Sequence, residues 1–245
     1  MNAAPISFTR LPQTIETVLF DFGGTLDADG VAWKERFHGL YKSDGLAMTT
    51  GAFAPAFYAA DDALIGGLAP TVGFHETVSA LAANLEAELA ARRSAIGDAS
   101  PADSRRGQRV AEQFLARASA ILARNRPVLE ALGQRRRLGV VSNFYGNLEA
   151  VCDSAGLAPL FGVMVDSHRV GVQKPDPAIF RAALDALHAA PETSLYVGDS
   201  LRRDCEGARR AGLTFVWITP EGSEARVRSV AAALAELPQL LNLLQ

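Results

Sequence analysis

Short runs of apolar, β-branched and aromatic residues recur along the chain, and each ends in a polar or glycine-rich turn. The first is Thr17–Phe22, which leads directly into Gly23 and Gly24. Runs that are apolar at nearly every position are typical of strands buried on both faces of a sheet. Four further runs of this kind cover residues 138–142, 162–166, 195–199 and 214–218.

Helical stretches separate the last four of these predicted strands, at about residues 146–155, 177–189 and 202–211. Strands that alternate with helices in this way predict parallel pairing, because each helix carries the chain back to the starting edge of the sheet. The pattern therefore predicts an α/β fold, a Rossmann-like, doubly wound parallel sheet.

The stretch between the first and second predicted strands has a different pattern. Residues 31–126 contain no convincing strand, but residues 74–93 and 105–124 carry apolar side chains at three- and four-residue intervals, as an amphipathic helix requires. We therefore predict an α-helical cap domain over residues 28–125, inserted into a core formed by residues 1–27 and 126–245. The crossings into the cap are expected near residues 27–30 and 125–127.

Composition excludes several classes of protein. The chain has 245 residues, of which 49% are hydrophobic, and a formal net charge of −3, which gives no reason to expect a nucleic acid or an anionic membrane as partner. No apolar run approaches a membrane span, and Met1–Thr17 lacks the pattern of a secretory signal. The two cysteines predict buried thiols in a reducing compartment, so we expect a cytoplasmic protein. Either a monomer or a homodimer is expected, and the sequence does not distinguish them.

Polar side chains and glycines gather where the predicted strands end. Ligands of open parallel sheets bind at this edge, beyond the carboxyl ends of the strands. The set consists of Asp21, Gly23, Gly24 and Thr25 after the first strand, Ser142 and Asn143 after the second, Asp199, Ser200 and Asp204 after the fourth, and Lys174 in a loop before a helix. Three carboxylates, one ammonium group and freely accessible amides fit a phosphoryl group together with one Mg²⁺ ion.

Four segments that contain these residues resemble, in order, the four motifs of the haloacid dehalogenase (HAD) superfamily. They are 18–26 (VLFDFGGTL), 140–143 (VVSN), 174–180 (KPDPAIF) and 197–200 (VGDS) followed by Asp204. The resemblance covers residues 17–220, and the predicted cap occupies the position of the family's cap between motifs one and two.

The resemblance implies a role for each residue of the set. Asp21 would be the nucleophile that forms an aspartyl-phosphate, and Lys174 would assist it. Mg²⁺ would be held by Asp21, Asp199, Asp204 and the backbone carbonyl of Gly23. Ser142, Asn143 and Lys174 would bind the phosphoryl group of a small phosphorylated metabolite, and Gly24 and Thr25 would shape the loop. Taken singly, Ser142 and Asp204 also fit helix N-caps.

The chain departs from the family pattern at Gly23. Phosphatases of the family usually carry at this position a second Asp, which protonates the leaving oxygen, and such a group contributes about 10²–10⁴-fold to the rate. The first interpretation is a phosphatase for substrates with good leaving groups, such as acyl phosphates, or one whose proton comes from a cap residue. Asp27, Lys34, His38 and His75 are the candidates for this role.

Three alternatives remain open. The chain could bind a phosphorylated ligand without useful turnover. It could also be similar to phosphonoacetaldehyde hydrolases, in which a cap lysine forms a Schiff base, a role that would fall to Lys34 or Lys42. Residues 21–25 (DFGGT) also resemble the phosphate-binding turn of sugar kinases of the actin/hexokinase fold, but the second phosphate turn of that fold is missing from the sequence. Dehalogenation is disfavoured, because a dehalogenase does not need the metal motif at Asp199.

Aromatic and basic residues of the predicted cap have two possible roles. They are Trp33, Phe37, His38, Tyr41, Phe53, Phe57 and Tyr58. Their helical spacing favours packing between the cap helices, and lining of the substrate pocket is the alternative.

Overall fold

A computed structural model describes residues 11, 14–95, 103, 105–220 and 230–244. Its centre is a six-stranded sheet in which every pair of neighbouring strands is parallel. The strands are β1 (Thr17–Phe20), β2 (Arg137–Ser142), β3 (Val163–Asp166), β4 (Ser194–Gly198), β5 (Thr214–Ile218) and β6 (Ala232–Leu234), in the order β3-β2-β1-β4-β5-β6. The prediction of a Rossmann-like parallel α/β sheet is confirmed.

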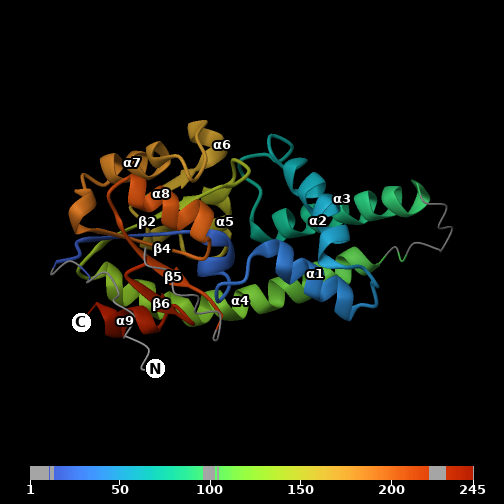
Figure 1. The fold of residues 1–245 in the computed structure, drawn as a ribbon, viewed down its shortest axis with the longest axis horizontal. Helices are drawn as coiled ribbons and strands as arrows, with labels where there is room; N and C mark the ends of the chain where they lie inside the picture. The colour runs from blue at the N-terminus through green and yellow to red at the C-terminus, as the bar shows by residue number, and fades with distance from the viewer. Residues whose placement is uncertain (1–10, 12–13, 96–102, 104, 221–229, 245) are drawn as a thin grey trace, which may run out of the picture.

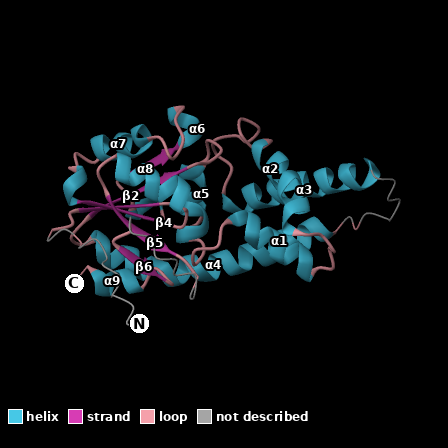
Figure 2. Cartoon of the chain, in the orientation of Figure 1, coloured by secondary structure: helices cyan, strands magenta, loops and turns pink. Residues whose placement is uncertain are grey.

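Helices cover both faces of the sheet (Figures 1 and 2). Alternate strand residues contribute to two separate apolar clusters, with Leu19 on one face and Val18 and Phe20 on the other. The first face packs against α7 (Pro177–Ala186) and α8 (Glu206–Arg210). The second packs against α4 (Arg106–Gly133), α5 (Leu148–Ser154) and α9 (Gln239–Leu243). Shorter helical segments are α6 (Ser167–Val170), η2 (Ala158–Leu160) and η3 (Pro191–Thr193).

A lobe of long helices lies beside the sheet, between β1 and β2 in the sequence (Figure 1). It comprises α1 (Trp33–Ser43), α2 (Thr50–Asp62), α3 (Phe74–Ala95) and the first half of α4. The apolar positions predicted for residues 74–93, including Val78, Leu81 and Leu85, are buried between these helices. The helical character of this insert therefore follows the sequence pattern. Its status as a separate domain with the limits 28–125 stays a prediction.

Helix α4 joins the lobe to the sheet without a break. It continues through Pro127, so the chain passes residues 125–127, where the sequence predicted the crossing between cap and core, inside one helix. Phe114 is buried within the lobe, whereas Leu129 and Leu132 are buried under the sheet, and all three belong to one apolar cluster. A proline in a helix removes one backbone hydrogen bond, at a cost of about 3 kcal/mol. Burial of the apolar residues on both sides of Pro127 offsets this cost.

Within the described part of the chain, no helix combines the length and the apolar character that a membrane span requires. The side chains of Cys152 and Cys205 are both buried, as predicted.

Candidate active site

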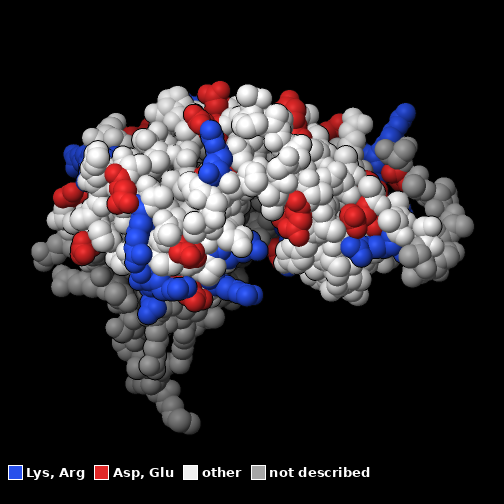
Figure 3. All heavy atoms as spheres, turned by 90° about the horizontal axis from the view of Figure 1, so that it is seen from above, with Lys and Arg blue, Asp and Glu red and all other residues white. Residues whose placement is uncertain are grey.

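The sheet register brings the ends of the three central strands to one edge. Phe20, the last residue of β1, lies opposite Val140 of β2 and Val197 of β4. The residues that follow these positions include Asp21, Ser142 and Asp199, which the sequence assigned to the site. The space-filling view shows a hollow between the lobe that contains the sheet and the helical lobe (Figure 3).

Asp21 is almost completely buried at the end of β1, and one of its two carboxylate oxygens carries its contacts. Oδ1 accepts hydrogen bonds from the backbone N–H of Phe22 at 2.8 Å and from Ser142 Oγ at 2.7 Å. The same oxygen lies 2.8 Å from Nζ of Lys174. Among the described residues, the hydrogen bonds and ion pairs of this carboxylate all involve Oδ1, so Oδ2 is the oxygen left for a ligand.

Lys174 connects two carboxylates from different strand ends. Its Nζ lies 2.7 Å from Oδ1 of Asp204 and donates to the hydroxyl of Tyr196 at 3.0 Å, in addition to its contact with Asp21. Burial alone would lower the pKa of Lys174, but the charges of Asp204 and Asp21 outweigh burial and raise it. Lys174 is therefore a buried ammonium group paired with two carboxylates.

The three predicted metal-binding carboxylates converge. One oxygen each from Asp21, Asp199 and Asp204 can be chosen so that all lie within 4.8 Å of one another. Burial raises the pKa of Asp199 well above its ordinary value, and the charges of Asp204 and Asp21 raise it further. One ammonium group faces three carboxylates, so the site has an excess of negative charge that suits a divalent cation.

The loop after β1 adopts the turn η1 (Phe22–Leu26), in which Gly24 has a φ of +89°. A Cβ atom at Gly24 would lie 2.5 Å from Oδ2 of Asp199, so only glycine allows the loop and this carboxylate to approach so closely. Thr25 is fully buried, and its hydroxyl donates to Oδ1 of Asp199 at 3.3 Å. Gly24 and Thr25 thus shape the loop around Asp199.

Asn143 and Asp176 position Lys174. The side chain of Asn143 accepts from the backbone N–H of Lys174 at 2.7 Å and donates to its carbonyl at 3.1 Å. Asp176 caps helix α7 by accepting from the N–H of Ala178, and Pro177 occupies the first turn. Because its side chain holds the Lys174 backbone, Asn143 can offer its backbone N–H, but not its side chain, to a phosphoryl group.

Neither Ser142 nor Asp204 is a helix N-cap. Ser142 donates to Asp21, and the cap of α5 is Asn147. Asp204 lies inside the turn η4 (Leu201–Cys205), where its Oδ2 accepts from the backbone N–H of Ser200 at 2.9 Å. Both side chains therefore point to the site rather than to a helix end.

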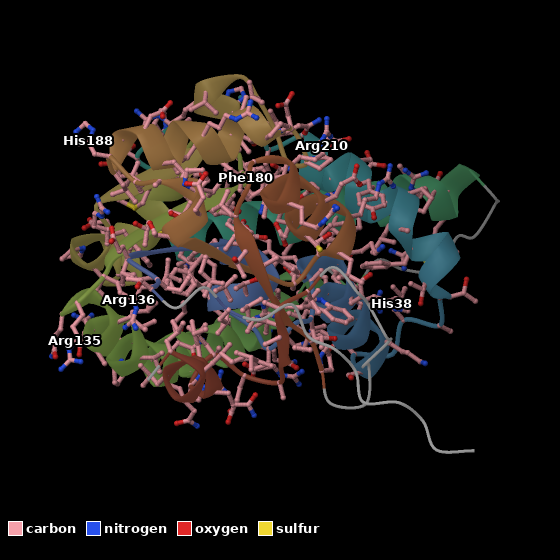
Figure 4. The ribbon with its side chains drawn as sticks, turned by 60° about the vertical axis from the view of Figure 1, so that its left-hand side comes forward. His38, Arg135, Arg136, Phe180, His188 and Arg210 are labelled. Carbon is pink, nitrogen blue, oxygen red and sulfur yellow. The ribbon has the colours of Figure 1, made fainter. Side chains whose placement is uncertain are left out.

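The four cap residues considered as proton donors are engaged elsewhere. Asp27 is fully buried and accepts from Gly24 N, Trp33 Nε1 and Arg36 Nη1 at 2.7–2.8 Å, so it joins the motif-one loop to α1 as a structural carboxylate. His38 lies on α1 and contacts the carbonyl of Met48 (Figure 4).

Lys34 and His75 do not face the carboxylates either. A hydrogen bond from Lys34 to the Tyr58 hydroxyl raises the pKa of the ammonium group, as does Glu35. His75 lines a separate open pocket of about 510 Å³ with Arg126 and Ser154.

Most of the aromatic cap residues pack against one another. Phe37, Tyr41 and Phe53 are fully buried, and the Phe37 ring stacks on Phe114 with 4.7 Å between centroids. Tyr58 is exposed. Trp33 differs from the others, because its indole lies against Gly23 of the motif-one loop.

One residue that contacts the site, Tyr196, was missing from the sequence prediction. Tyr196 lies inside β4, where its ring packs against Phe180 of α7, and its hydroxyl donates to the carbonyl of Val141 at 2.8 Å. Phe180 is labelled in Figure 4. In the sequence, Tyr196 is one residue of an apolar run, and its hydroxyl was the only sign that it could contact the site. Trp33 was named as an aromatic of the cap, but its place beside Gly23 depends on how the lobe docks.

A family model described as haloacid dehalogenase-like hydrolase matches residues 15–212, which is most of the chain and includes all four motifs. The chain belongs to this family of hydrolases. The resemblance inferred from the sequence motifs is thereby confirmed, and the rival fold of the sugar kinases is excluded.

Curated relatives match the chain over shorter stretches. The haloacid dehalogenase-like hydrolase domain-containing protein 3 of Bos taurus is 37% identical over 109 residues, which are 44% of this chain and 43% of the relative. A phosphoserine phosphatase of Thermus thermophilus is 47% identical over 75 residues, 29% of this chain and 30% of that protein. The matched stretches thus span less than half the length of these relatives.

Solved structures of the family share the fold over nearly the whole chain. A dehalogenase aligns with a TM-score of 0.62 at 18% identity, covering 95% of this chain and 98% of its own. A HAD phosphatase from Thermococcus onnurineus aligns with a TM-score of 0.56 at 21% identity, covering 94% and 98%. At this identity the likeness establishes the fold alone.

Proposed function

We propose that this HAD-family hydrolase is a Mg²⁺-dependent phosphatase that cleaves a small phosphorylated metabolite through an aspartyl-phosphate on Asp21. The observation that carries the proposal is the contact set of Asp21, whose Oδ1 is held by Ser142 and Lys174 while Oδ2 has no such partner among the described residues. Relatives named phosphoserine phosphatase and glyceraldehyde 3-phosphate phosphatase support a small phosphorylated molecule as substrate.

The first step is attack by Oδ2 of Asp21 on phosphorus. A new P–O bond forms to Asp21, the bond from phosphorus to the leaving oxygen breaks, and this oxygen departs with the bonding electron pair. In the second step, water attacks the phosphorus of the aspartyl-phosphate, so that orthophosphate is released and the Asp21 carboxylate is regenerated. Lys174, Ser142 and the backbone N–H of Asn143 are suited to bind the phosphoryl oxygens throughout.

The residues of this chain fit a Mg²⁺ ion. Carboxylate oxygens of Asp21, Asp199 and Asp204 lie within 4.8 Å of one another, and burial, followed by the charges of Asp204 and Asp21, raises the pKa of Asp199. Both oxygens of Asp204 already accept hydrogen bonds, from Lys174 and from Ser200, so this residue is suited to hold the ion through water. The carbonyl of Gly23 would complete the ligands from the protein. When bound, the ion would lower the repulsion between the phosphoryl group and Asp21.

Substrate preference follows from Gly23, because no side chain at this position can protonate the leaving oxygen. Both oxygens of the nearby Asp27 are engaged by Gly24, Trp33 and Arg36, so this residue is not available to the leaving group either. A general acid contributes about 10²–10⁴-fold to the rate. We therefore infer that the substrate has a leaving group that is stable as an anion, as in an acyl phosphate.

Two alternatives have weaker support. A Schiff base requires a neutral amine, whereas Lys34 has a raised pKa and an ion pair with Glu35. A protein that binds a phosphorylated ligand without turnover would use the same site, and only an assay distinguishes it from an enzyme.

The test compares an acyl or activated aryl phosphate with an alkyl phosphate, with Mg²⁺ and with EDTA. We expect Mg²⁺-dependent turnover of the activated substrates, a far lower rate on the alkyl phosphate, and loss of turnover in Asp21→Asn. Asp185→Asn, which changes an exposed carboxylate of α7, is the matched control and should retain activity. Tight binding of inorganic phosphate without turnover of any phosphate would instead support the binding protein.

A further inference from the structure

Gly23 is adjacent to the site, yet its backbone does not require glycine. Its φ of −74° and ψ of 120° lie in the extended region that any L-residue adopts. A Cβ atom at this position would lie 3.1 Å from Nε1 and 3.3 Å from Cδ1 of Trp33. The indole of Trp33, and not the conformation of the loop, is therefore what excludes a side chain at residue 23.

Trp33 cannot easily move aside. Its Nε1 donates to Oδ2 of Asp27 at 2.8 Å, and the same carboxylate binds Gly24 and Arg36. The indole also packs edge-to-face against Phe114 of the helical lobe and Phe144 of the loop after β2, with centroids 5.2 and 6.0 Å apart. Only 8% of the residue is exposed. Contacts from both lobes thus fix the ring beside the motif-one loop.

We infer that Trp33 is a specificity-determining residue: its indole occupies the space in which a side chain at position 23 would protonate the leaving group. The inference rests on the proposed phosphatase function and extends it. The indole N–H is committed to Asp27, so the ring offers the leaving oxygen no proton in place of the missing acid. Substrates are then selected for leaving groups that depart as stable anions. Gly23→Asp alone, with Trp33 intact, does not restore a working acid.

A stability measurement tests the packing claim with small changes. At an ordinary φ and ψ, replacement of glycine by alanine stabilises a protein by restricting the unfolded chain. Gly23→Ala should nevertheless lower the thermal midpoint, because its Cβ meets the indole. Gly39→Ala is the control: it lies in α1 with no atom within 4 Å of the new Cβ, and it should raise the midpoint. A rise with Gly23→Ala would overturn the inference.

Activity in a set of double variants tests the specificity claim. Trp33→Leu removes the atoms at the positions of Nε1 and Cε2, whereas Trp33→Phe keeps a ring there, and both lose the hydrogen bond to Asp27. Combined with Trp33→Leu, Gly23→Asp should raise the rate on an alkyl phosphate relative to an aryl phosphate by about tenfold or more. The same substitution should give no such gain when Trp33 is intact or replaced by phenylalanine. Asparagine has the shape of aspartate but carries no acid. Gly23→Asn combined with Trp33→Leu should therefore show no gain in the alkyl phosphate rate.

A second readout is specific to an acid. In the double variant Gly23→Asp, Trp33→Leu, alkyl phosphate turnover should fall at high pH as the new carboxyl group ionises. The double variant Gly23→Asn, Trp33→Leu should lack this limb of the pH profile. An equal gain from Gly23→Asp with Trp33 intact would overturn the inference, and so would identical pH profiles of the two double variants. Absence of wild-type turnover on every phosphate would instead refute the proposed function, while the stability comparison would still decide the packing claim.

Discussion

Replacement of Lys174 by methionine is the most informative single perturbation of the site. Methionine retains an unbranched side chain of similar length but removes the ammonium group. In the wild type this group contacts Asp21 at 2.8 Å and Asp204 at 2.7 Å, and the side chains of Lys174 and Asp204 are 1% and 0% exposed. Removal of one partner from a buried ion pair typically costs about 3–5 kcal/mol, because the remaining charge has no compensation.

We therefore expect Lys174→Met to lower the free energy of unfolding by about 3–5 kcal/mol. Urea denaturation in EDTA measures this value without a metal ion that could replace the ammonium group. Asp204→Asn should recover part of the loss when it is combined with Lys174→Met, because it removes the unpaired charge. In the wild-type background, Asp204→Asn should destabilise, since it weakens a pair that Lys174 still needs.

Turnover of an acyl phosphate should be lost in Lys174→Met and should not return in the double variant, because the phosphoryl group would still lack its cation. A loss of stability below about 1 kcal/mol, or additive effects of the two substitutions, would refute the view that Lys174 neutralises the carboxylates.

Three further predictions concern the loop, the ion and the contact between the lobes. Gly24→Ala should abolish turnover and destabilise the fold by about 1–3 kcal/mol, because it combines a φ of +89° with a Cβ 2.5 Å from Asp199. A near-normal rate would contradict the close approach of this loop to Asp199. Mg²⁺ at about 100 times its Kd should stabilise the protein by about 2.7 kcal/mol, and Asp199→Asn should remove this thermal shift, while Asp185→Asn should keep it. Asp61 accepts a hydrogen bond from the Tyr145 hydroxyl. Burial raises the pKa of Asp61 above 3.8; the hydrogen bond from Tyr145 and the charge of Arg203 lower this pKa, and the charge of Asp62 raises it. Its protonated form stabilises the fold at low pH, and this contribution is lost as the pH rises from 3.8 through the raised pKa. Asp61→Asn should therefore flatten the pH dependence of unfolding in that window, and parallel curves for the two proteins would exclude the assignment.

The convergence of the site could be predicted because it depends on topology. Parallel strands end at one edge, so Asp21, Ser142 and Asp199 were expected at the same edge of the sheet; the strand order that makes β1, β2 and β4 neighbours came from the structure. β6 was not predicted, because Ala232–Leu234 is short and lacks β-branched residues. The continuity of α4 through Pro127 could not be predicted either, since burial on both sides of a proline can hold a helix together.

Contacts that depend on docking of the helical lobe could not be predicted. Asp27 was named as a possible acid, because the sequence shows a carboxylate six residues after the nucleophile but not its partners. Gly24 donates to it within the same loop, but Trp33 and Arg36 supply their donors only after α1 has packed against this loop. With three donors directed at its two oxygens, Asp27 holds the loop against α1.

The same docking changes how the substitution at Gly23 is understood. From the sequence alone, glycine in place of an acid suggests that a function was simply lost. In the structure the glycine leaves room for an indole that is itself anchored to Asp27, and Asp27 receives the N–H of Gly24 in the same loop. Gly23, Trp33 and Asp27 therefore form one unit, in which a change at any one alters the fit of the other two. An acid at residue 23 requires a smaller residue at 33, and a smaller residue at 33 removes a donor from the carboxylate that holds the loop against α1.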